Sequence, residues 1–295
     1  MGGTRDDYVF LTPFDSAFPE RLKTIPQPPR GIYVKGSLPD PEKPSVAVIG
    51  ARSNTEYGRK VAQLFAAGLA RHGVQIISGM ARGIDGIAQE AAVNAGGASF
   101  GVLGCGVNVV YPKLNAELFE KVEASGGIIS EYPPDMEARA ELFPQRNRII
   151  SGLCDILLVV EARIKSGTAI TVRCALDQGR DVFAVPGRIS DPLSVGCNAL
   201  IADGAGVANR PEDILEALGL MEKSPGTQVF FKTGLRGLPP GQVNVLRCID
   251  YAPTGMGELA RKTGLDMQEL MEILLKLELG GMITRCGASH YIKKI

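Results

Sequence analysis

Short apolar runs alternate with longer amphipathic stretches along most of this 295-residue chain. The apolar runs have the length of buried strands and end at glycine-rich turns, whereas apolar residues between them recur at helical spacing. Strands are predicted at residues 46–49, 75–78, 99–103, 127–130, 156–160 and 181–185. The 156–160 run is the most apolar, so we expect it to be the central strand. Alternating strands and helices predict an α/β fold over residues 44–220, a doubly wound, Rossmann-like parallel sheet.

Two helix starts in this region carry capping signals. Ser53 and Glu56 have the spacing of a capping box, which predicts that the helix after the first strand starts at Ser53. Pro211 is expected to be the first residue of the last helix, because proline is favoured at that position.

The segments on either side of this domain follow other patterns. Residues 1–43 form a proline-rich N-terminal extension, in which long helices are disfavoured and residues 32–35 are expected to be an edge strand. Residues 221–238 are rich in Ser, Pro, Gly and Thr, which is typical of a linker. Residues 239–295 form a second domain, with helices predicted at 242–249, 256–262 and 266–279 and a hairpin at 282–285 and 290–293. Three helices and a hairpin in this order predict a winged-helix domain.

Composition limits the classes of function. Lys plus Arg and Asp plus Glu both total 32, so any nucleic-acid binding must come from a local cluster rather than from bulk charge. The six cysteines include no CxxC pair and there are only two histidines, so we expect no metal site. No Walker-type loop is present and the first glycine-rich turn lacks the GxGxxG pattern, so we expect no nucleotide cofactor. Neither a membrane-spanning apolar stretch nor a secretory signal is present, which predicts a cytoplasmic protein without a membrane partner.

The first two strands both end at glycine-rich turns that contain an arginine. Gly50, Arg52 and Ser53 follow the first strand, and Gly79 and Arg82 follow the second. The carboxyl ends of parallel strands share one sheet edge, where helix N-termini and guanidinium groups attract phosphate oxygens. The alternative is that these glycines only make tight turns. The matched arginines favour an anion site.

Further candidates lie at later turns of the same edge. Lys113 and Asn115 stand where a helix begins after the third strand, although by residue type alone Lys113 is more typical of a solvated surface lysine. Ser166 and Thr168 close the turn after the 156–160 strand, and their hydroxyls are expected to complete a phosphate cradle. The chain has no tryptophan, so Phe143 is the candidate for base stacking, with anchoring of the preceding loop as its alternative.

Arg146 and Arg148 lie in one predicted helix but on different faces, because residues 146 and 150 share a face and residue 148 does not. They are therefore not expected to contact the same phosphate. One of them is expected to pair with a carboxylate such as Glu161 or Asp85, and the sequence does not decide which.

These turns, in their context, resemble the DprA/Smf family of bacterial DNA-processing proteins. The resemblance continues in ordered blocks from about residue 14 to residue 215. The blocks are GCGV at 104–107, YPKLN at 111–115, SEYPP at 130–134, FPQRNRIIS at 143–151, VVEA at 159–162, SGTAIT at 166–171, AVPG at 184–187 and GCN at 196–198. Lys113 matches a basic position of the family, which favours its functional interpretation.

The resemblance implies a function as well as a fold. Such proteins bind single-stranded DNA, load the recombinase RecA onto it in natural transformation, form homodimers through the α/β domain and have no established catalytic reaction. We therefore expect a recombination mediator that holds single-stranded DNA by its phosphates. Arg52 and Lys113 are expected to make direct charged contacts, with Arg82 as a further contact.

The alternative is a nucleotide-binding enzyme that resembles the cytokinin-activating phosphoribohydrolases, whose signature turn PGGxGTxxE includes a glutamate that takes part in catalysis. Residues 166–171 keep the Gly-Thr pair, but Thr171 stands where the glutamate would be. A threonine cannot act as a carboxylate base. The sequence thus favours binding over catalysis.

The third helix of the winged-helix domain would enter the groove in a reader of duplex DNA. Its acidic residues outnumber Lys276, which favours a protein-contact or packing role. The acidic residues are Asp266, Glu269, Glu272 and Glu278. Arg285, Lys293 and Lys294 of the hairpin leave DNA contact open.

Overall fold

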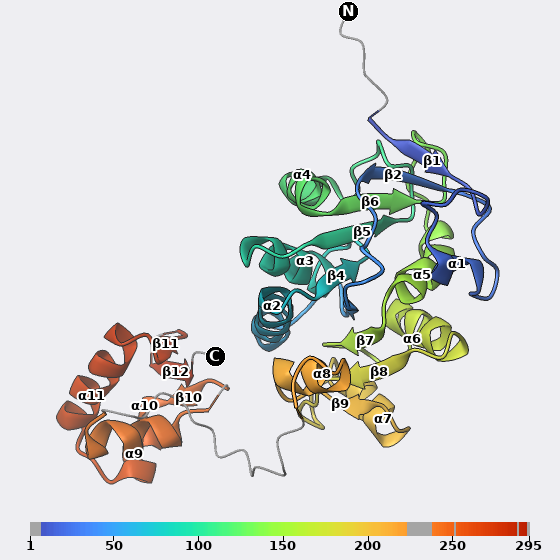
Figure 1. Cartoon of the computed structure of the whole chain (residues 1–295). Coiled ribbons are helices and arrows are strands. Elements are labelled where there is room, and N and C mark those ends of the chain that lie inside the picture. Colours follow the sequence, from blue (N-terminus) through green and yellow to red (C-terminus); the bar gives the residue numbers. More distant parts are fainter. Residues whose placement is uncertain (1–6, 223–237, 251, 288, 294–295) are drawn as a thin grey trace, which may run out of the picture. The chain divides into compact units, whose positions relative to one another are not determined.

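The computed structural model describes residues 7–222, 238–250, 252–287 and 289–293. The chain separates into two compact units, Met1–Lys223 and Ser224–Ile295 (Figure 1). The first unit contains the α/β domain and the second contains the winged-helix domain. None of the helices in the described ranges has the length and apolar character needed to cross a membrane.

One nine-stranded sheet is the centre of the first unit, counted over the described residues. Its order is β1-β2-β6-β5-β4-β3-β7-β8-β9. The pairs β1–β2 and β2–β6 are antiparallel, and the others are parallel. The strands are β1 (Val9–Leu11), β2 (Ile32–Gly36), β3 (Ser45–Ile49), β4 (Gln75–Ser78), β5 (Ser99–Leu103), β6 (Gly127–Ser130), β7 (Ile156–Val159), β8 (Asp181–Ala184) and β9 (Gly206–Val207).

Helices cover both faces of this sheet, because successive residues of each strand point to opposite sides. In β3, Val46 and Val48 belong to a core cluster with residues of α2, α3 and α8, whereas Ala47 and Ile49 belong to a second cluster with residues of α1, α5, α6 and α7. The helices are α1 (Glu20–Lys23), α2 (Glu56–Arg71), α3 (Ile84–Asn94), α4 (Ala116–Ser125), α5 (Leu142–Leu153), α6 (Gly167–Asp177), α7 (Val195–Ala202) and α8 (Pro211–Ala217), with a 3-10 turn at Lys113–Asn115.

The predicted doubly wound α/β fold is confirmed, and so is the start of α8 at Pro211. Other details were wrong. Helix α2 begins at Glu56 after Thr55, whose side chain accepts from the Gly58 amide, so Ser53 is not the cap. Strand β2 is not an edge strand, because β1 pairs with its outer side. Strand β7 is interior but not central, because the middle position belongs to β4.

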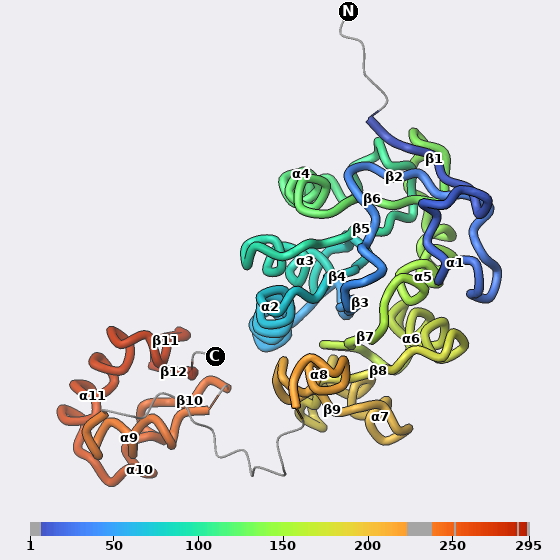
Figure 2. The backbone as a smooth tube through the Cα atoms, in the orientation of Figure 1, coloured from blue at the N-terminus to red at the C-terminus, as the bar shows by residue number. Residues whose placement is uncertain are grey.

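The strand order reverses beside β3. The chain runs from β3 through β4 and β5 to β6 in one direction, then returns through α5 to β7 on the other side of β3 (Figure 2). A sheet of this kind has a crevice at the carboxyl ends of the two strands where the order reverses, because the following loops lead away to opposite sides. Here those loops follow Ile49 and Val159.

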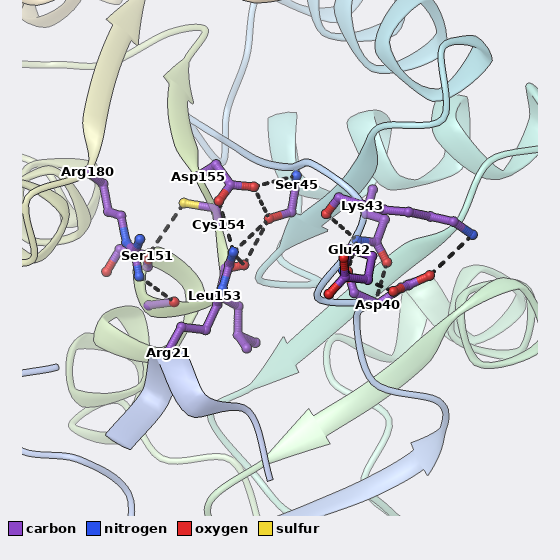
Figure 3. A network of polar contacts seen from close by, with 12 residues as sticks. Arg21, Asp40, Glu42, Lys43, Ser45, Ser151, Leu153, Cys154, Asp155 and Arg180 are labelled. Carbon is purple, nitrogen blue, oxygen red and sulfur yellow. Dashed lines mark hydrogen bonds and ion pairs between the residues drawn. The ribbon is translucent and has the colours of Figure 1, made fainter. Parts of the chain in front are cut away.

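The amino ends of the same two strands are closed by a polar network (Figure 3). The Asp155 carboxylate accepts from the Ser45 amide (2.8 Å) and pairs with Arg21 of the N-terminal segment (2.9 Å). Arg21 also donates to the carbonyl oxygen of Leu153 (2.7 Å). These contacts join residues more than 100 positions apart, and they anchor α1 beneath the sheet.

The second unit confirms the predicted winged-helix domain. Helices α9 (Pro240–Cys248), α10 (Met256–Thr263) and α11 (Met267–Leu279) precede the hairpin of β11 (Ile283–Arg285) and β12 (His290–Lys293). Asp266 caps α11 by accepting from the amides of Gln268 and Glu269, both at 2.9 Å. A short strand that the sequence did not predict, β10 (Thr254–Gly255), pairs with β12. Lys294 and most of the predicted linker lie outside the described residues.

Candidate nucleic-acid interface

A groove of about 650 Å³ lies at the point where the strand order reverses. Its walls are the loops after β3 and β7, the first turns of α5 and α6, and Tyr111 from the loop after β5. Of the residues predicted from sequence, those that line it are Gly50, Arg52, Ser53, Phe143, Arg146, Ser166 and Thr168. The fold therefore brings together residues from three segments that are far apart in the chain.

An aromatic pair and an arginine form one wall of the groove. The rings of Tyr111 and Phe143 are 5.4 Å apart at an angle of 31°. The Arg52 guanidinium lies 5.4 Å from the centroid of the Phe143 ring, which is a cation–π contact. Phe143 is half-buried and packs over Gly104, where a Cβ atom would be 2.6 Å from the ring. Phe143 is thus held in place at one face and lines the groove at the same time.

Beneath this wall, Arg146 and Asp85 form a buried floor. Arg146 is 4% exposed and donates to the carbonyl oxygens of Gly79 (3.0 Å) and Val102. The Gly79 amide donates to the Asp85 carboxylate at 3.2 Å. A Cβ atom at Gly79 would lie 2.7 Å from Asp85 and 2.8 Å from Arg146, so the position has room only for glycine.

Burial opposes charge on both groups of the floor. It raises the pKa of Asp85, against the attraction of Arg146 and the hydrogen bonds from the Gly79 and Gly50 amides. It lowers the pKa of Arg146 to about 10, against the attraction of Asp85. Arg146 therefore stays protonated at neutral pH and places a fixed positive charge under the groove.

A second buried carboxylate holds the loop after β3. Glu161 is 1% exposed and accepts from the Thr55 amide (3.0 Å) and from the Thr55 hydroxyl. Thr55 in turn accepts from the Gly58 amide at 3.0 Å. A side chain at Gly58 would overlap the Glu161 carboxyl group, so this glycine is needed for close approach. Glu161 thereby fixes the loop that presents Arg52.

The two arginines of α5 have different partners. Arg148 pairs with Glu131 at 2.7 Å and donates to the carbonyl oxygen of Gln27 at 2.8 Å. Arg146 faces Asp85, which was one of the two predicted carboxylates. The other, Glu161, is bound to Thr55 instead. Arg146 and Arg148 therefore contact different groups, as predicted, and only Arg146 lines the groove.

The remaining predicted residues lie outside the groove lining. Asn115 donates to the carbonyl oxygens of Met80 (2.9 Å) and Ala81 (3.3 Å), which braces the turn after β4. Arg82 and Lys113 are exposed. The structure adds Arg163, which is exposed in the loop after β7 and lines the groove. Arg163 directly follows the VVEA block in the sequence. Its place at the groove depends on the reversal of strand order, which the sequence did not show.

The described residues contain no cluster of His, Cys, Asp or Glu that could hold a metal ion.

A family model described as DNA recombination-mediator protein A matches residues 9–219. A second, the DprA winged helix domain, matches residues 233–288. This chain belongs to the DNA recombination-mediator protein A (DprA) family.

Individual relatives of the DprA family agree with this assignment. Protein Smf of Escherichia coli (strain K12) is 40% identical over 280 residues, which cover 93% of this chain and 75% of the relative. The X-ray structure of DprA from Streptococcus pneumoniae superposes with a TM-score of 0.68 and 38% identity, covering 71% of this chain and 74% of that one. DprA from Helicobacter pylori, whose structure concerns its single-stranded DNA binding mode, gives a TM-score of 0.64 and 28% identity, covering 72% and 96%.

Proposed function

We propose that this chain binds single-stranded DNA by its phosphates in the groove and acts as a non-catalytic recombination mediator. Membership of the DprA family supports the mediator role. The H. pylori relative, described in terms of its single-stranded DNA binding mode, supports the choice of ligand. Loading of RecA in natural transformation, a cytoplasmic location and a homodimer formed through the α/β domain belong to the same proposal, and they rest on the family resemblance alone.

The observation that carries this proposal is the combination of charge and aromatic surface in one groove. Arg52 and Arg163 are exposed at its rim, and Phe143 with Tyr111 offers a ring surface beside them. Sequence-independent binding of single strands uses this combination, because phosphates are attracted by cations while every base has a face that stacks. The chain has no net charge, so a local site of this kind is required.

The phosphoribohydrolase alternative lacks its carboxylate. Thr171 lines the groove at the position of the expected glutamate. Among the described residues that line the groove, Asp85 is the only carboxylate, and it lies in the floor beside Arg146. A general acid or base must reach the substrate, and the groove offers no such exposed group among these residues.

The proposal is tested by a salt series of binding to single-stranded and duplex oligonucleotides. Each single-strand phosphate contacted should add about 0.7 to the slope of log affinity against log salt. Arg52→Ala should weaken single-strand binding roughly ten- to hundredfold, because a charge-assisted contact contributes about 1.5–3 kcal/mol. Arg52→Lys should restore only part of this, since an ammonium cannot make a two-pronged contact.

A matched control lies on the same helix that follows Arg52. Arg71 is exposed at the far end of α2, which has 16 residues and is therefore about 24 Å long. Arg71→Ala removes the same charge and should leave the affinity unchanged. A preference for duplex DNA, or an equal loss in both variants, would contradict the proposed function.

A further inference from the structure

Helix α11 of the winged-helix domain has an apolar face that the described part of the domain does not cover. The core takes another side of the helix, where the buried residues are Leu270, Ile273, Leu274 and Leu277. The large apolar side chains that are exposed in the described part of this domain all belong to α11. They are Met267 (44% exposed), Met271 (48%), Leu275 (56%) and Leu279 (79%). Exposed apolar residues are common singly, so a row of them on one helix needs an explanation.

These side chains form one stripe. Residues four apart lie on the same side of a helix, and the stripe repeats this spacing from the first residue of α11 to the last. Glu278 lies on this side as well, about two turns after Met271. Its carboxylate accepts from the Arg285 amide at 3.1 Å, so it is directed to the hairpin. The apolar stripe therefore runs along the whole helix.

Two residues of opposite charge border the stripe. Glu272 follows Met271 and Lys276 follows Leu275, so the acid precedes the base along one edge of the stripe. Both side chains are exposed, and the carboxylate oxygen and the ammonium nitrogen are 3.9 Å apart. When a second α11 packs antiparallel on the stripe, the same edges of the two helices meet and the order is reversed. Glu272 of each helix then lies beside Lys276 of the other.

The same two-fold arrangement matches the apolar residues. With the axis near Ile273, Met271 of one helix meets Leu275 of the other, and residues 267 and 279 meet in the same way. A partner with charges of one sign would meet a like charge at one of the two edge positions, whereas a copy of the helix does not. The described part of the domain has as many basic as acidic residues, so two copies do not repel each other through net charge.

We propose that the stripe on α11 is a contact surface for a second copy of this chain, packed antiparallel through the same stripe. Four side chains from each chain cover less area than a stable dimer needs, so the contact is transient and joins copies that are already close together. It is distinct from the homodimer proposed for the α/β domain, because α11 belongs to the second unit. It also does not rest on DNA binding in the groove.

The first test records the contact in the unmodified sequence. Photo-methionine replaces methionine in a mixture of ¹⁴N- and ¹⁵N-labelled chains, and light links each methionine to the group that it touches. Mass spectrometry should find α11 peptides joined through Met271 with one peptide of each isotope, because such hybrid links form only between two chains. Links from Met271 to peptides of the α/β domain would identify a different occupant and overturn the inference, and so would an absence of hybrid links between α11 peptides.

The second test places a charge in the stripe. Leu275→Glu should lower the yield of hybrid links roughly tenfold, because a carboxylate in an apolar contact loses its water without gaining a partner. Leu176→Glu is the control, since Leu176 is 60% exposed on α6 of the other unit and should leave the yield unchanged. Thermal melting shows whether both variants are folded. An equal fall in the two variants would contradict the contact.

The charged edge allows a test that is specific for two copies of one chain. Glu272→Lys and Lys276→Glu each bring like charges together across the two-fold axis, so each variant alone should give about fivefold fewer hybrid links. In an equimolar mixture of the two variants, each labelled with one isotope, every edge meets an edge of opposite charge. The yield of hybrid links should then return to that of the unmodified protein. A yield that stays low in the mixture would overturn the self-contact, because complementary edges of two copies must restore it.

Discussion

Removing the Glu161 carboxylate should destabilise the α/β domain and loosen the loop that carries Arg52. Glu161→Ala eliminates the hydrogen bonds from the Thr55 amide and hydroxyl and leaves a buried cavity. A hydrogen bond to a charged group contributes about 1.5–3 kcal/mol, but the Thr55 hydroxyl keeps its contact to Gly58. We therefore expect a loss of about 3 kcal/mol in the free energy of unfolding.

For a unit of this size, 1 kcal/mol corresponds to roughly 2–4 °C, so Tm should fall by about 6–12 °C. Differential scanning calorimetry of the whole chain is the appropriate measurement, since it can resolve the transitions of the two units. Glu161→Gln retains an acceptor oxygen and should lower the free energy of unfolding by about half as much as Glu161→Ala. Gly58→Ala forces the same carboxyl group out of place and should reproduce part of the effect.

Glu120 provides the control for Glu161, because it is exposed on α4. Glu120→Ala should change stability by no more than about 0.5 kcal/mol, as is usual for surface positions. If Glu161→Ala melts within about 2 °C of the unmodified protein yet loses DNA binding, Glu161 acts on the ligand and not on the fold. That result would refute the assignment of this carboxylate to the start of α2.

Three further outcomes are expected from the structure. Deletion of residues 223–295 should leave most single-strand affinity intact in an oligonucleotide titration, because the groove lies wholly within the first unit. Asp155→Ala should lower the unfolding free energy by about 1–2 kcal/mol without changing DNA affinity, because its partly exposed network with Ser45 lies at the opposite sheet edge. Burial raises the pKa of Cys154 and Cys197 from 9.0 to about 12, so stability that is complete below pH 9 should decline as the pH rises toward 12. Both thiols should also resist iodoacetamide at pH 8 until urea is added, which mass spectrometry can establish.

Local patterns predicted the main elements of the fold because these strands are buried on both faces. An apolar run such as 99–103 has the length of a buried strand and ends at a glycine-rich turn, and the structure places β5 at Ser99–Leu103. The strands of this sheet that were missed are short. Strands β1 and β9 have 3 and 2 residues, so neither offers a periodic signal.

The candidate site was predicted less completely, because its decisive contacts are long-range. Glu161 and Thr55 are separated by 106 residues, and no local pattern indicates that one fills the helix start of the other. The capping-box spacing of Ser53 and Glu56 was therefore misleading. Thr55 caps the helix instead, and the distant Glu161 carboxylate holds the Thr55 amide. Arg163 was missed for the same reason, since its place at the groove depends on strand order.

The charged residues of the winged-helix domain are those expected if DNA binds only in the groove of the α/β domain. Helix α11 occupies the recognition position, yet three of its four charged residues are acidic, and the fourth, Lys276, lies 3.9 Å from Glu272. If this helix entered the groove of duplex DNA, its carboxylates would lie close to the DNA phosphates and repel them. This repulsion is unfavourable for a reader of duplex DNA. The truncation experiment tests this separation directly.

The arginines of the groove have two electrostatic roles that salt should distinguish. Arg52 and Arg163 are exposed, so their charges are hydrated and are screened within about 10 Å at 0.1 M salt. Arg146 has already lost its water on folding, and it keeps its proton because its pKa of about 10 is far above neutrality. A phosphate that enters the groove thus meets one charge that needs no further desolvation or movement, and such preorganised groups interact more strongly than mobile ones. Substitution of a rim arginine should therefore reduce the salt dependence of binding, whereas the contribution of Arg146 should persist at high salt.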